Sequence, residues 1–539
     1  MPGTYRSPRA AITPTKCPQF VSFDESGATP CPRSHGRGSR IRLGYDKKRK
    51  DRTWRSTTTT SPLLAAVKDQ PTVARTPEAK TAQPTVQPAG KDLRTVARIL
   101  VVTTAQPTVQ PARVPPTAAR TPEATTAPPT EPPDRLSVLS RCIATHPEKF
   151  ATEHWGRRPL LSQSHALPRD FGDLLSADTV DELIAERGVR APFIRLAKDG
   201  DLLARDCYLG PAGFGAEMPD QVDSAKVLSQ FASGATIVLQ GLHRLWPPLI
   251  DFVRDAVDEL GHPVQANAYV TPPTNRGFDP HYDVHDVFIL QAAGQKRWIV
   301  HEPVHEDPLP SQPWTQHRAA IAERVTEEPV IDTVLSEGDA LYLPRGWVHS
   351  AQALQTTSVH LTIGVSTVTR LDVARAVVDQ LATVDSFRTS LPMGGDPADH
   401  DESIATVTKV MAEMVDSLRD DASVLSGGAA ATLIERHADR TRPVAVRPLA
   451  SLLAVDRAGT TEVHWRHGLL ATVEHTAGRV VLRLPDRVMT FPVSCAEAVA
   501  ALHRGLVADA GSLPGLDRAD GTVLIRRLLR EAVVVPFKG

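Results

Sequence analysis

The sequence predicts a mainly β core folded as a double-sheet jelly roll, followed by helical segments. Between residues 192 and 366, short runs rich in β-branched and aromatic residues recur, separated by Gly, Pro and acidic turn residues. Many short strands with such turns are typical of the double-stranded β-helix, the cupin-type barrel. After residue 368 the apolar residues recur at helical spacing instead.

Composition narrows the class of protein. The chain has 539 residues and a formal net charge of −1, so bulk charge favours no polyanionic partner. Its five cysteines form no CxxC pair, which argues against a disulfide framework or a zinc site and fits a reducing cytosol. No apolar run reaches about 18 residues, and no charged start precedes an apolar core, so we expect neither a membrane span nor a secretory signal.

Residues 1–134 are predicted to be a disordered extension. The first part is basic and includes Lys47-Lys48-Arg49-Lys50, and from Ser56 the segment is rich in Thr, Pro and Ala. The octapeptide AQPTVQPA occurs twice, at 82–89 and 105–112. Such a composition offers too little apolar surface to offset the entropy of ordering. Three interpretations of the basic cluster stay open: a tether to nucleic acid or ribosomes, a solvated tail, or residues upstream of the true start codon.

The ordered part is expected to begin near Leu136. Apolar spacing predicts a helix within 136–162, ending at the break Trp155 to Pro159, and a second helix over 178–186 capped by Ser176 or Asp178. Strands are predicted at 192–200, 235–242, 265–272, 280–291 and 295–303. An irregular insertion is predicted at 304–328, before the remaining strands within 329–354 and 357–366.

The last third of the chain predicts two further modules. Amphipathic helices are expected at 369–384 and 402–420, separated by a Gly/Pro/Asp break, and they form either a dimer interface or a cover on the barrel. From 447 the predicted order of helix, strands, two helices and a strand resembles a winged helix. Its nearest approach to a basic recognition helix is Arg526, Arg527 and Arg530, so protein docking is favoured over specific DNA binding. The predicted domains are therefore 1–134, 135–367, 368–445 and 446–539.

The candidate metal ligands are His281, Asp283 and His349. On a strand, residues i and i+2 share a face, so the predicted strand would place His281 and Asp283 side by side. His349 follows the sharp Pro344-Arg345-Gly346 bend, which would aim it into the barrel. Two histidines and one carboxylate are the facial triad that binds non-haem Fe(II) and leaves positions open.

A candidate anion site lies nearby at Lys296. This residue is flanked by Trp298 and Ile299, an apolar setting in which an unpaired ammonium group is costly. A cosubstrate carboxylate would supply the missing partner.

Four motifs together resemble the JmjC ribosomal oxygenases. They are N-A-Y-V-T-P from Asn267, H-Y-D-x-H-D-V-F-I-L-Q from His281, G-Q-K-R-W from Gly294 and G-D-x-L-Y-L-P-R-G-W-V-H from Gly338. The resemblance runs from about Leu136 to the C-terminus and leaves the N-terminal extension outside. It implies a JmjC-type cupin fold with a helical dimerisation segment and a C-terminal winged helix.

The resemblance also implies an activity: cytoplasmic Fe(II)- and 2-oxoglutarate-dependent hydroxylation of a ribosomal protein by a homodimer, with O2 as second cosubstrate. By position, the iron ligands fall on His281, Asp283 and His349. The lysine that binds the 2-oxoglutarate carboxylate falls on Lys296, and polar residues of that site fall on Asn267 and Tyr269. The arginine-hydroxylating bacterial branch usually has arginine at the lysine position, so Lys296 favours histidine as the target.

Other histidines are given structural interpretations. His285 is expected to face substrate or solvent, and His301 and His305 to lie on the surface. His360 either lines the site or packs in the core. Three functional alternatives stay open: a demethylase of N-methylated lysine, a small-molecule tailoring hydroxylase and a catalytically silent cupin binding module.

Overall fold

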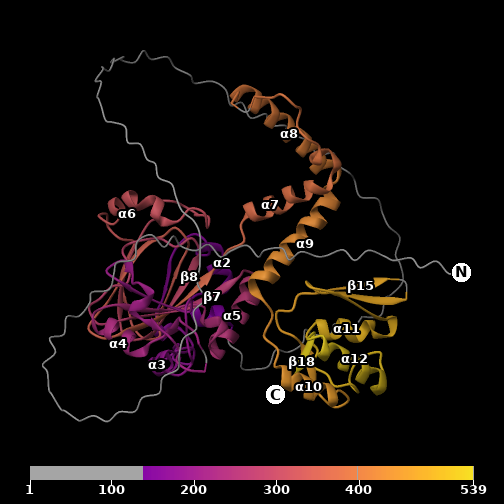
Figure 1. Cartoon of the computed structure of the whole chain (residues 1–539), viewed down its shortest axis with the longest axis horizontal. Helices are drawn as coiled ribbons and strands as arrows, with labels where there is room; N and C mark the ends of the chain where they lie inside the picture. Colours follow the sequence, from indigo (N-terminus) through magenta and orange to yellow (C-terminus); the bar gives the residue numbers. More distant parts are fainter. Residues whose placement is uncertain (1–136, 216, 397, 477, 538–539) are drawn as a thin grey trace, which may run out of the picture. The chain divides into compact units, whose positions relative to one another are not determined.

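A computed structural model describes residues 137–215, 217–396, 398–476 and 478–537 (Figure 1). The N-terminal extension predicted at 1–134 lies outside these residues. No helix among the described residues is both long and apolar enough to cross a membrane.

The core of the described residues is built on two facing antiparallel sheets, as the strand pattern predicts. The larger sheet has eight strands in the described part of the chain and the smaller has three. In spatial order the larger sheet contains β1 (Leu160–Ser162), β11 (Ala340–Leu343), β8 (Asp286–Ala293), β13 (Ser358–Val365), β7 (Val264–Thr271), β6 (Thr236–Leu239), β2 (Ile194–Lys198) and β3 (Asp201–Leu202). The smaller sheet contains β10 (Ile331–Leu335), β9 (Lys296–His301) and β12 (Val348–Ala353).

The strands β8 and β9 follow one another but lie in different sheets. The turn between them is made at Gly294, where φ is +65° and a Cβ atom would lie 2.1 Å from the carbonyl oxygen of Thr357. Only glycine fits that approach. As a result, β8 pairs with β11 and β13, whereas β9 pairs with β10 and β12. The chain thus crosses from one sheet to the other between two parts of the candidate site.

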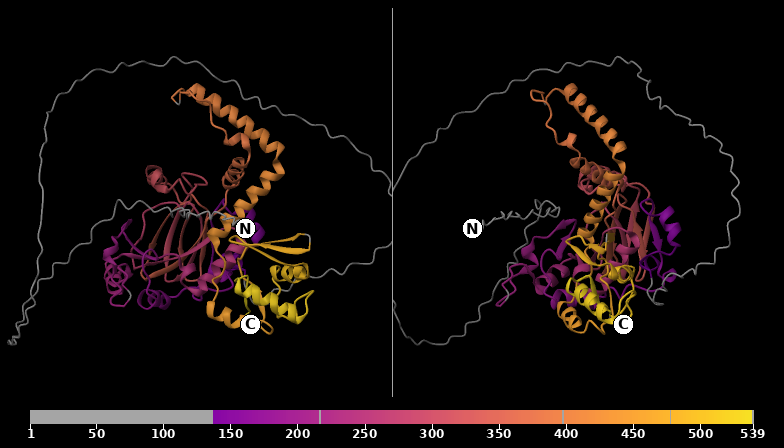
Figure 2. Two further views of the ribbon diagram at one scale, coloured as in Figure 1. Left: turned by 45° about the vertical axis from the view of Figure 1, so that its right-hand side comes forward. Right: turned by 90° about the vertical axis from the view of Figure 1, so that its right-hand side faces the viewer.

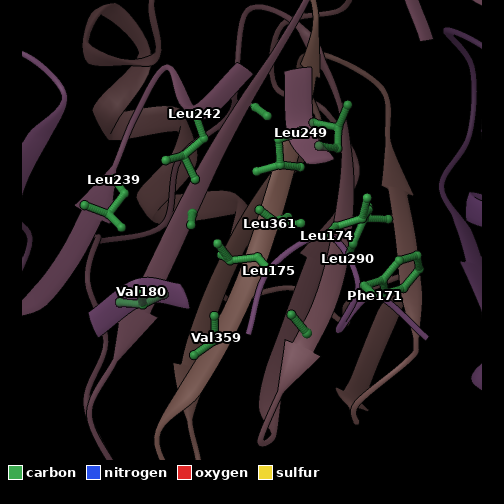
Figure 3. Close-up of a cluster of buried hydrophobic side chains, with 14 of the residues drawn as sticks. Phe171, Leu174, Leu175, Val180, Leu239, Leu242, Leu249, Leu290, Val359 and Leu361 are labelled. Carbon is green, nitrogen blue, oxygen red and sulfur yellow. The ribbon is translucent and has the colours of Figure 1, made fainter. Parts of the chain in front are cut away.

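The two faces of the larger sheet carry different residues. On β13, Val359, Leu361 and Ile363 belong to a large apolar cluster that includes residues of the helices α3 (Ala177–Ala185) and α5 (Pro247–Leu260) (Figure 3). The alternate residues His360 and Thr362 lie on the opposite face, toward the smaller sheet. A second apolar cluster, with Val287, Ile289, Trp298, Val300 and Leu341 among its members, fills part of the space between the sheets. The inner face is therefore apolar on β8 and polar on β7 and β13.

Short helices surround the larger sheet. They are α1 (Val138–Cys142), α2 (Pro147–Glu153), α3 (Ala177–Ala185), α4 (Ser224–Ala232) and α5 (Pro247–Leu260). A small hairpin of β4 (Leu209–Gly210) and β5 (Gln221–Val222) precedes α4. The helix predicted within 136–162 is wrong in part, because the chain forms two short helices and then β1. Pro147 starts the second helix, and its missing N–H explains why one continuous helix does not form. The predicted cap of α3 is confirmed at Ser176, whose side chain accepts from the N–H of Thr179.

The insertion predicted to be irregular is partly helical. It contains a 3-10 helix at Trp314–His317 and the helix α6 (Arg318–Arg324). Ile321 is buried there together with Tyr282 and Val348, so the insertion packs against the segments that carry the candidate metal ligands. A short helix with one buried anchor gives too weak a periodic signal to be recognised in the sequence.

Three helices follow the core. They are α7 (Arg370–Gln380), α8 (His400–Asp420) and α9 (Ala422–Thr441), of which α9 was not predicted as a separate element (Figure 2). The helices α7 and α9 pack together through a hydrogen bond of 3.1 Å from Gln380 to Thr432 and an ion pair of 2.6 Å between Arg436 and Asp379.

The C-terminal residues form a separate apolar cluster of helices and strands. Its elements are α10 (Pro448–Asp456), β14 (Val463–Trp465), β15 (Thr472–Thr476), β16 (Arg479–Arg483), β17 (Val488–Pro492), α11 (Ala496–His503), α12 (Arg518–Arg530) and β18 (Val534–Pro536). β14 pairs with β18, and β15, β16 and β17 form an antiparallel sheet. The predicted order is confirmed, with β14 added.

Candidate metal centre and anion site

The structure brings His281, Asp283 and His349 together. One possible ligand atom from each residue lies within 4.8 Å of the others, and this is the group of metal-binding type found among the described residues. The imidazole rings of His281 and His349 have centroids 4.6 Å apart, and His349 Nε2 lies 3.9 Å from Asp283 Oδ2.

The way in which His281 and Asp283 are placed differs from the prediction. They do not lie on a strand, because β8 begins only at Asp286. His281 instead forms an isolated β-bridge with His349, in which each backbone N–H donates to the other residue's carbonyl oxygen at 3.1 and 2.8 Å. The alternation argument was therefore wrong for this pair. Its conclusion holds because the bridge fixes His281 directly against His349 on β12.

Hydrogen bonds orient both imidazole rings. Nδ1 of His281 lies 2.7 Å from the carbonyl oxygen of Asp279, and Nδ1 of His349 lies 3.0 Å from that of Trp347. A carbonyl can only accept, so each Nδ1 carries the hydrogen. This tautomer leaves each Nε2 with a free lone pair, and such outer hydrogen bonds typically fix metal-binding histidines.

The electrostatic setting favours the ligand forms of these groups. Burial lowers the pKa of His349 to about 4, and the neighbouring His281 adds to the effect, so its imidazole is neutral at physiological pH. Burial alone would raise the pKa of Asp283, but His285, His349, His281 and Arg195 together outweigh it and hold that pKa below its usual value. Neutral imidazoles and an ionised carboxylate are the states that bind a divalent metal.

A buried carboxylate holds the two ligand-bearing segments together. Asp286 is fully buried, and it accepts from the hydroxyl of Tyr342 at 2.7 Å and from the backbone N–H of Arg345 at 3.1 Å. The N–H of Gly346 donates to the carbonyl oxygen of Asp283 at 3.0 Å. The bend before His349 is thus tied to the segment that carries Asp283.

One face of β7 carries a row of polar residues. Gln265, Asn267, Tyr269 and Thr271 alternate with buried apolar residues, and their exposure falls along the strand from Gln265 to Thr271. Their partners on β13 are Gly364, Thr362, His360 and Ser358. This polar row places Asn267 and Tyr269 on the inner face, and their part in the cosubstrate site stays a prediction. The Asn267 side-chain oxygen accepts from the N–H of Gly241 at 2.9 Å.

Lys296 lies at the buried end of the polar row. Its side chain is 4% exposed, and its Nζ donates to Thr271 Oγ1 at 3.1 Å. Burial lowers the pKa of Lys296 to about 7. In the described part of the chain no carboxylate is recorded as an ion-pair partner of this ammonium group. The apolar setting read from the sequence is confirmed, and an incoming carboxylate would satisfy the charge.

His360 and His285 complete the surroundings of the site. The buried His360 ring stacks on Tyr269 with centroids 5.1 Å apart, and its Nδ1 has no hydrogen-bond partner among the described residues. It therefore lines the site, which resolves the two interpretations left open. His285 is partly exposed and lies against Gly364, where a Cβ atom would be only 2.6 Å from its ring.

The prediction that His301 lies on the surface was wrong. His301 is 4% exposed and its Nδ1 is buried without a partner in the described chain. His305 is partly buried and stacks on His317, with ring centroids 4.8 Å apart. The helical insertion covers these residues, and because that insertion was read as irregular, their burial was missed.

The sequence analysis also missed Arg195. This residue lies on β2, 86 positions before the first candidate metal ligand (281 minus 195), and its side chain hydrogen bonds to Tyr269 and acts electrostatically on Asp283. No local motif identifies it. An arginine alternating with the apolar residues Ile194 and Leu196 was the available signal.

The donor set fits a divalent transition metal and an organic anion. Two imidazole nitrogens and one carboxylate oxygen at one corner of the space between the sheets are the ligand set of non-haem Fe(II). The ammonium group of Lys296 and the hydroxyls of Thr271 and Tyr269 are donors suited to a carboxylate.

Comparison with known proteins agrees with this chemistry. Residues 248–373 match the family model described as the JmjC domain. The chain is 30% identical over 219 residues to ribosomal oxygenase 1 of Gallus gallus, covering 40% of this chain and 34% of that protein. It is 43% identical over 108 residues to the bifunctional lysine-specific demethylase and histidyl-hydroxylase NO66 of Drosophila simulans, covering 19% and 12%. The matched region thus spans about a third or less of these relatives.

A solved structure was also matched. The ribosomal oxygenase YcfD of Escherichia coli is 17% identical, with a TM-score of 0.44 over 73% of this chain and 98% of that chain. The resemblance to JmjC ribosomal oxygenases that the motifs indicated is confirmed by the domain match and by the sequence relatives.

Proposed function

We propose that this chain, which carries a JmjC domain, is an Fe(II)- and 2-oxoglutarate-dependent dioxygenase that hydroxylates a protein side chain. The observation that carries the proposal is the convergence of His281, Asp283 and His349 within 4.8 Å, on the same inner face as the buried Lys296. A silent cupin module would have no need to keep a buried ammonium group, which is costly without a bound anion.

In this proposal His281, Asp283 and His349 bind the iron. Lys296 binds the far carboxylate of 2-oxoglutarate, and Tyr269 and Asn267 line the same site. Lysine at this position is a compact charge whose pKa of about 7 rises when a carboxylate pairs with it.

When bound, Fe(II), 2-oxoglutarate and O2 supply the oxidising chemistry that converts a C–H bond to C–OH, with succinate and CO2 as by-products. The chain's own residues hold the iron ligands in position and keep water out of the site. The Nδ1 hydrogen bonds of the two histidines hold their rings, and Asp286 keeps the bend before His349 in register with Asp283. Trp298, whose ring lies 5.9 Å from that of His349, and the apolar cluster around it exclude water from the inner end of the site.

We further propose that the target is a side chain of a ribosomal protein, with histidine favoured over arginine. The names of the relatives, ribosomal oxygenase and histidyl-hydroxylase, support this class of substrate. Within this class of substrate, lysine rather than arginine at position 296 favours histidine as the target residue. Such a substrate would place the enzyme in the cytoplasm.

The remaining modules are assigned by the same proposal. Residues 135–367 are the catalytic domain, 368–445 a homodimerisation region and 446–539 a winged-helix-like domain that docks protein rather than reading DNA. Support for the dimer comes from α8, which has no buried residue in the described chain and exposes Ile404, Val407 and Met411 along one side.

The deciding experiment compares intact masses of ribosomal proteins from a deletion strain and its parent. We expect one ribosomal protein to lose the mass of one oxygen atom in the deletion strain, and fragmentation to locate the change on histidine. Unchanged masses, together with normal 2-oxoglutarate turnover by the purified chain, would reject ribosomal proteins as the substrate and retain the enzyme class.

A second candidate is demethylation of N-methylated lysine, since the Drosophila simulans relative is named a lysine-specific demethylase as well as a histidyl-hydroxylase. The same iron centre would serve it, but the product would be formaldehyde. A methylated lysine peptide that yields formaldehyde in step with succinate would favour this candidate over hydroxylation.

A further inference from the structure

The insertion 304–328 contacts each segment that carries a candidate metal ligand. It leaves the smaller sheet after β9 and returns to it at β10. Its contacts fall on His281, on Tyr282 between the first two ligands, and on the bend that precedes His349. The positions next to the ligands are therefore the ones at which this insertion is attached to the core.

An aromatic residue of the insertion lies beside His281. The Trp314 ring, in the 3-10 helix of the insertion, has its centroid 5.9 Å from that of His281, and the Phe278 ring lies at the same distance. The guanidinium carbon of Arg318 lies 4.3 Å from the Trp314 ring centroid, a cation–π contact that favours this position of the indole. Because His281 is only partly buried, such ring contacts restrict an imidazole that solvent would otherwise leave mobile.

Tyr282 connects the insertion to two candidate ligands at once. Its chain neighbours His281 and Asp283 converge on the candidate metal site, whereas its own ring is buried with Ile321 of α6 in a separate apolar cluster. Its hydroxyl donates to the carbonyl oxygen of Gln312 at 2.9 Å. Tyr282 is 1% exposed, so its ring cannot shift without disturbing close-packed neighbours. A shift of this ring would move the backbone on both sides of it, and with the backbone both ligands.

The bend before His349 also packs against the insertion. At Gly346, where φ is +86°, a Cβ atom would lie 2.6 Å from the carbonyl oxygen of His305, an approach that only glycine permits. Arg345 Nη2 lies 2.8 Å from Asp307 Oδ1. The Asp307 carboxylate is exposed, so this ion pair contributes little stability, and the close backbone approach at Gly346 is the firmer contact.

We propose that the insertion 304–328 is a positioning element for the metal centre, and that Trp314 and Tyr282 are the positioning residues through which it holds His281 and Asp283. Ligands that are ordered before the metal arrives lose less conformational freedom on binding, so an ordered insertion raises the metal affinity. The coupling is reciprocal, so a bound metal ion also stabilises the insertion. The inference concerns metal binding and does not depend on which reaction the bound metal serves.

The test measures Co(II) binding to the full-length protein by calorimetry, with the visible absorption of bound Co(II) as a readout of ligand geometry. Trp314→Ala should weaken Co(II) binding about tenfold, the lower end of the effect of losing a contact that orients a metal ligand, and should alter the visible spectrum. Trp314→Phe, which keeps an aromatic ring, should restore most of the affinity. Tyr282→Phe lacks only the hydroxyl and should weaken binding by up to about fivefold, the effect of one hydrogen bond.

Two control variants separate positioning from general stability. Thr315→Ala changes an exposed neighbour of Trp314 in the same 3-10 helix and should retain the Co(II) affinity. Phe171→Leu alters a fully buried residue of the apolar cluster that includes α3 and α5, so it should lower the melting temperature and leave the Co(II) affinity unchanged.

Hydrogen exchange tests the reciprocal effect. Added Co(II) should slow amide exchange within 304–328 in the wild-type protein, and it should do so less in Trp314→Ala.

Unchanged Co(II) affinity in both Trp314→Ala and Tyr282→Phe would overturn the inference, as would exchange within 304–328 that does not respond to Co(II) in the wild-type protein. An equal loss of affinity in Phe171→Leu would reduce the effect to general stability and would overturn it too. The proposed function is judged separately, by succinate formation in the Fe(II)-loaded protein. A chain whose Co(II) affinity depends on Trp314 but which forms no succinate would keep the positioning role and lose the hydroxylase assignment.

Discussion

At the scale of single residues, the proposed metal centre consists of three candidate ligands, of which the two histidines are held together by backbone contacts rather than by a regular strand. Each histidine is oriented by a hydrogen bond to a carbonyl oxygen two residues earlier, so the rings are fixed before any metal binds. Removal of one ligand should therefore affect metal binding far more than folding.

For His281→Ala we expect loss of stoichiometric metal binding and of 2-oxoglutarate turnover, because two ligands hold Fe(II) too weakly. His281 is only partly buried, so the free energy of unfolding should fall by no more than about 2 kcal/mol. Metal analysis, a succinate assay and chemical denaturation test these three expectations. Substantial turnover in this variant would reject His281 as a ligand.

If Lys296 binds the cosubstrate as proposed, we expect the affinity for 2-oxoglutarate to depend on pH. Burial lowers the pKa of Lys296 to about 7, so above pH 7 the free protein is mainly neutral at this position. A carboxylate binds the protonated form, so binding must take up a proton. The affinity for 2-oxoglutarate should therefore be greatest below pH 7 and should fall by up to about tenfold per pH unit above it.

Calorimetric titration of the metal-loaded protein from pH 6 to pH 9 would measure this dependence. Lys296→Arg provides the matched control, since arginine stays charged throughout and its affinity should be nearly constant with pH. Lys296→Ala should weaken binding at every pH. A flat profile for the wild-type protein would contradict the role given to the buried lysine.

At the scale of elements, the site depends on how β8, β11 and β12 are connected. Asp286 at the start of β8 accepts from Tyr342 at the end of the neighbouring strand and from the bend that leads into β12. Burial raises the pKa of Asp286, and the hydrogen bonds from Tyr342 and Arg345 oppose that rise. The Asp286 carboxylate therefore connects the start of β8 with β11 and with the bend that leads into β12.

Asp286→Ala should leave the N–H of Arg345 and the Tyr342 hydroxyl without a buried acceptor, with an expected loss of about 2–4 kcal/mol in the free energy of unfolding. The shift of the bend should also weaken metal binding through His349. Asp286→Asn, which keeps an acceptor oxygen, should lie between the variant and the wild type. Urea denaturation and metal titration would measure both effects. Equal stability of all three proteins would contradict this connecting role of Asp286.

At the scale of the whole molecule, the chain combines a β core with long helices and a second helical and strand cluster. The helix α8 is amphipathic, yet none of its residues is buried in the described chain. Ile404, Val407, Met411 and Val415 are each between 49% and 57% exposed. An exposed apolar row of this kind favours association with a second copy.

We expect the wild-type protein to be a dimer, and the double variant Val407→Asp/Met411→Asp to be a monomer with an unchanged melting temperature for the core. Light scattering coupled to gel filtration measures the mass. Lys409→Asp, about 160° around the helix axis from both Val407 and Met411 by the 100° per residue of an α-helix, is the matched control and should remain dimeric. A monomeric wild-type protein, or a dimer that survives the double substitution, would remove α8 from the interface.

Local patterns in the sequence determined a large part of this description. The strand segments and the helix cap at Ser176 depend on side-chain alternation and on local hydrogen bonding, both of which act over a few residues. The choice of His281, Asp283, His349 and Lys296 came from residue types whose chemistry is specific even before their positions are known. The burial of Lys296 could be inferred because its neighbours on the strand are apolar.

Tertiary structure decided what depends on contacts between distant segments. The bridge between His281 and His349 replaces the strand that alternation predicted, and the helical insertion buries His301. Arg195 reaches Tyr269 only because β2, β6 and β7 are neighbours in the sheet. Strand order and sheet pairing are set by packing of whole elements, for which no short stretch of sequence carries a signal, so these parts of the site emerge only from the folded chain.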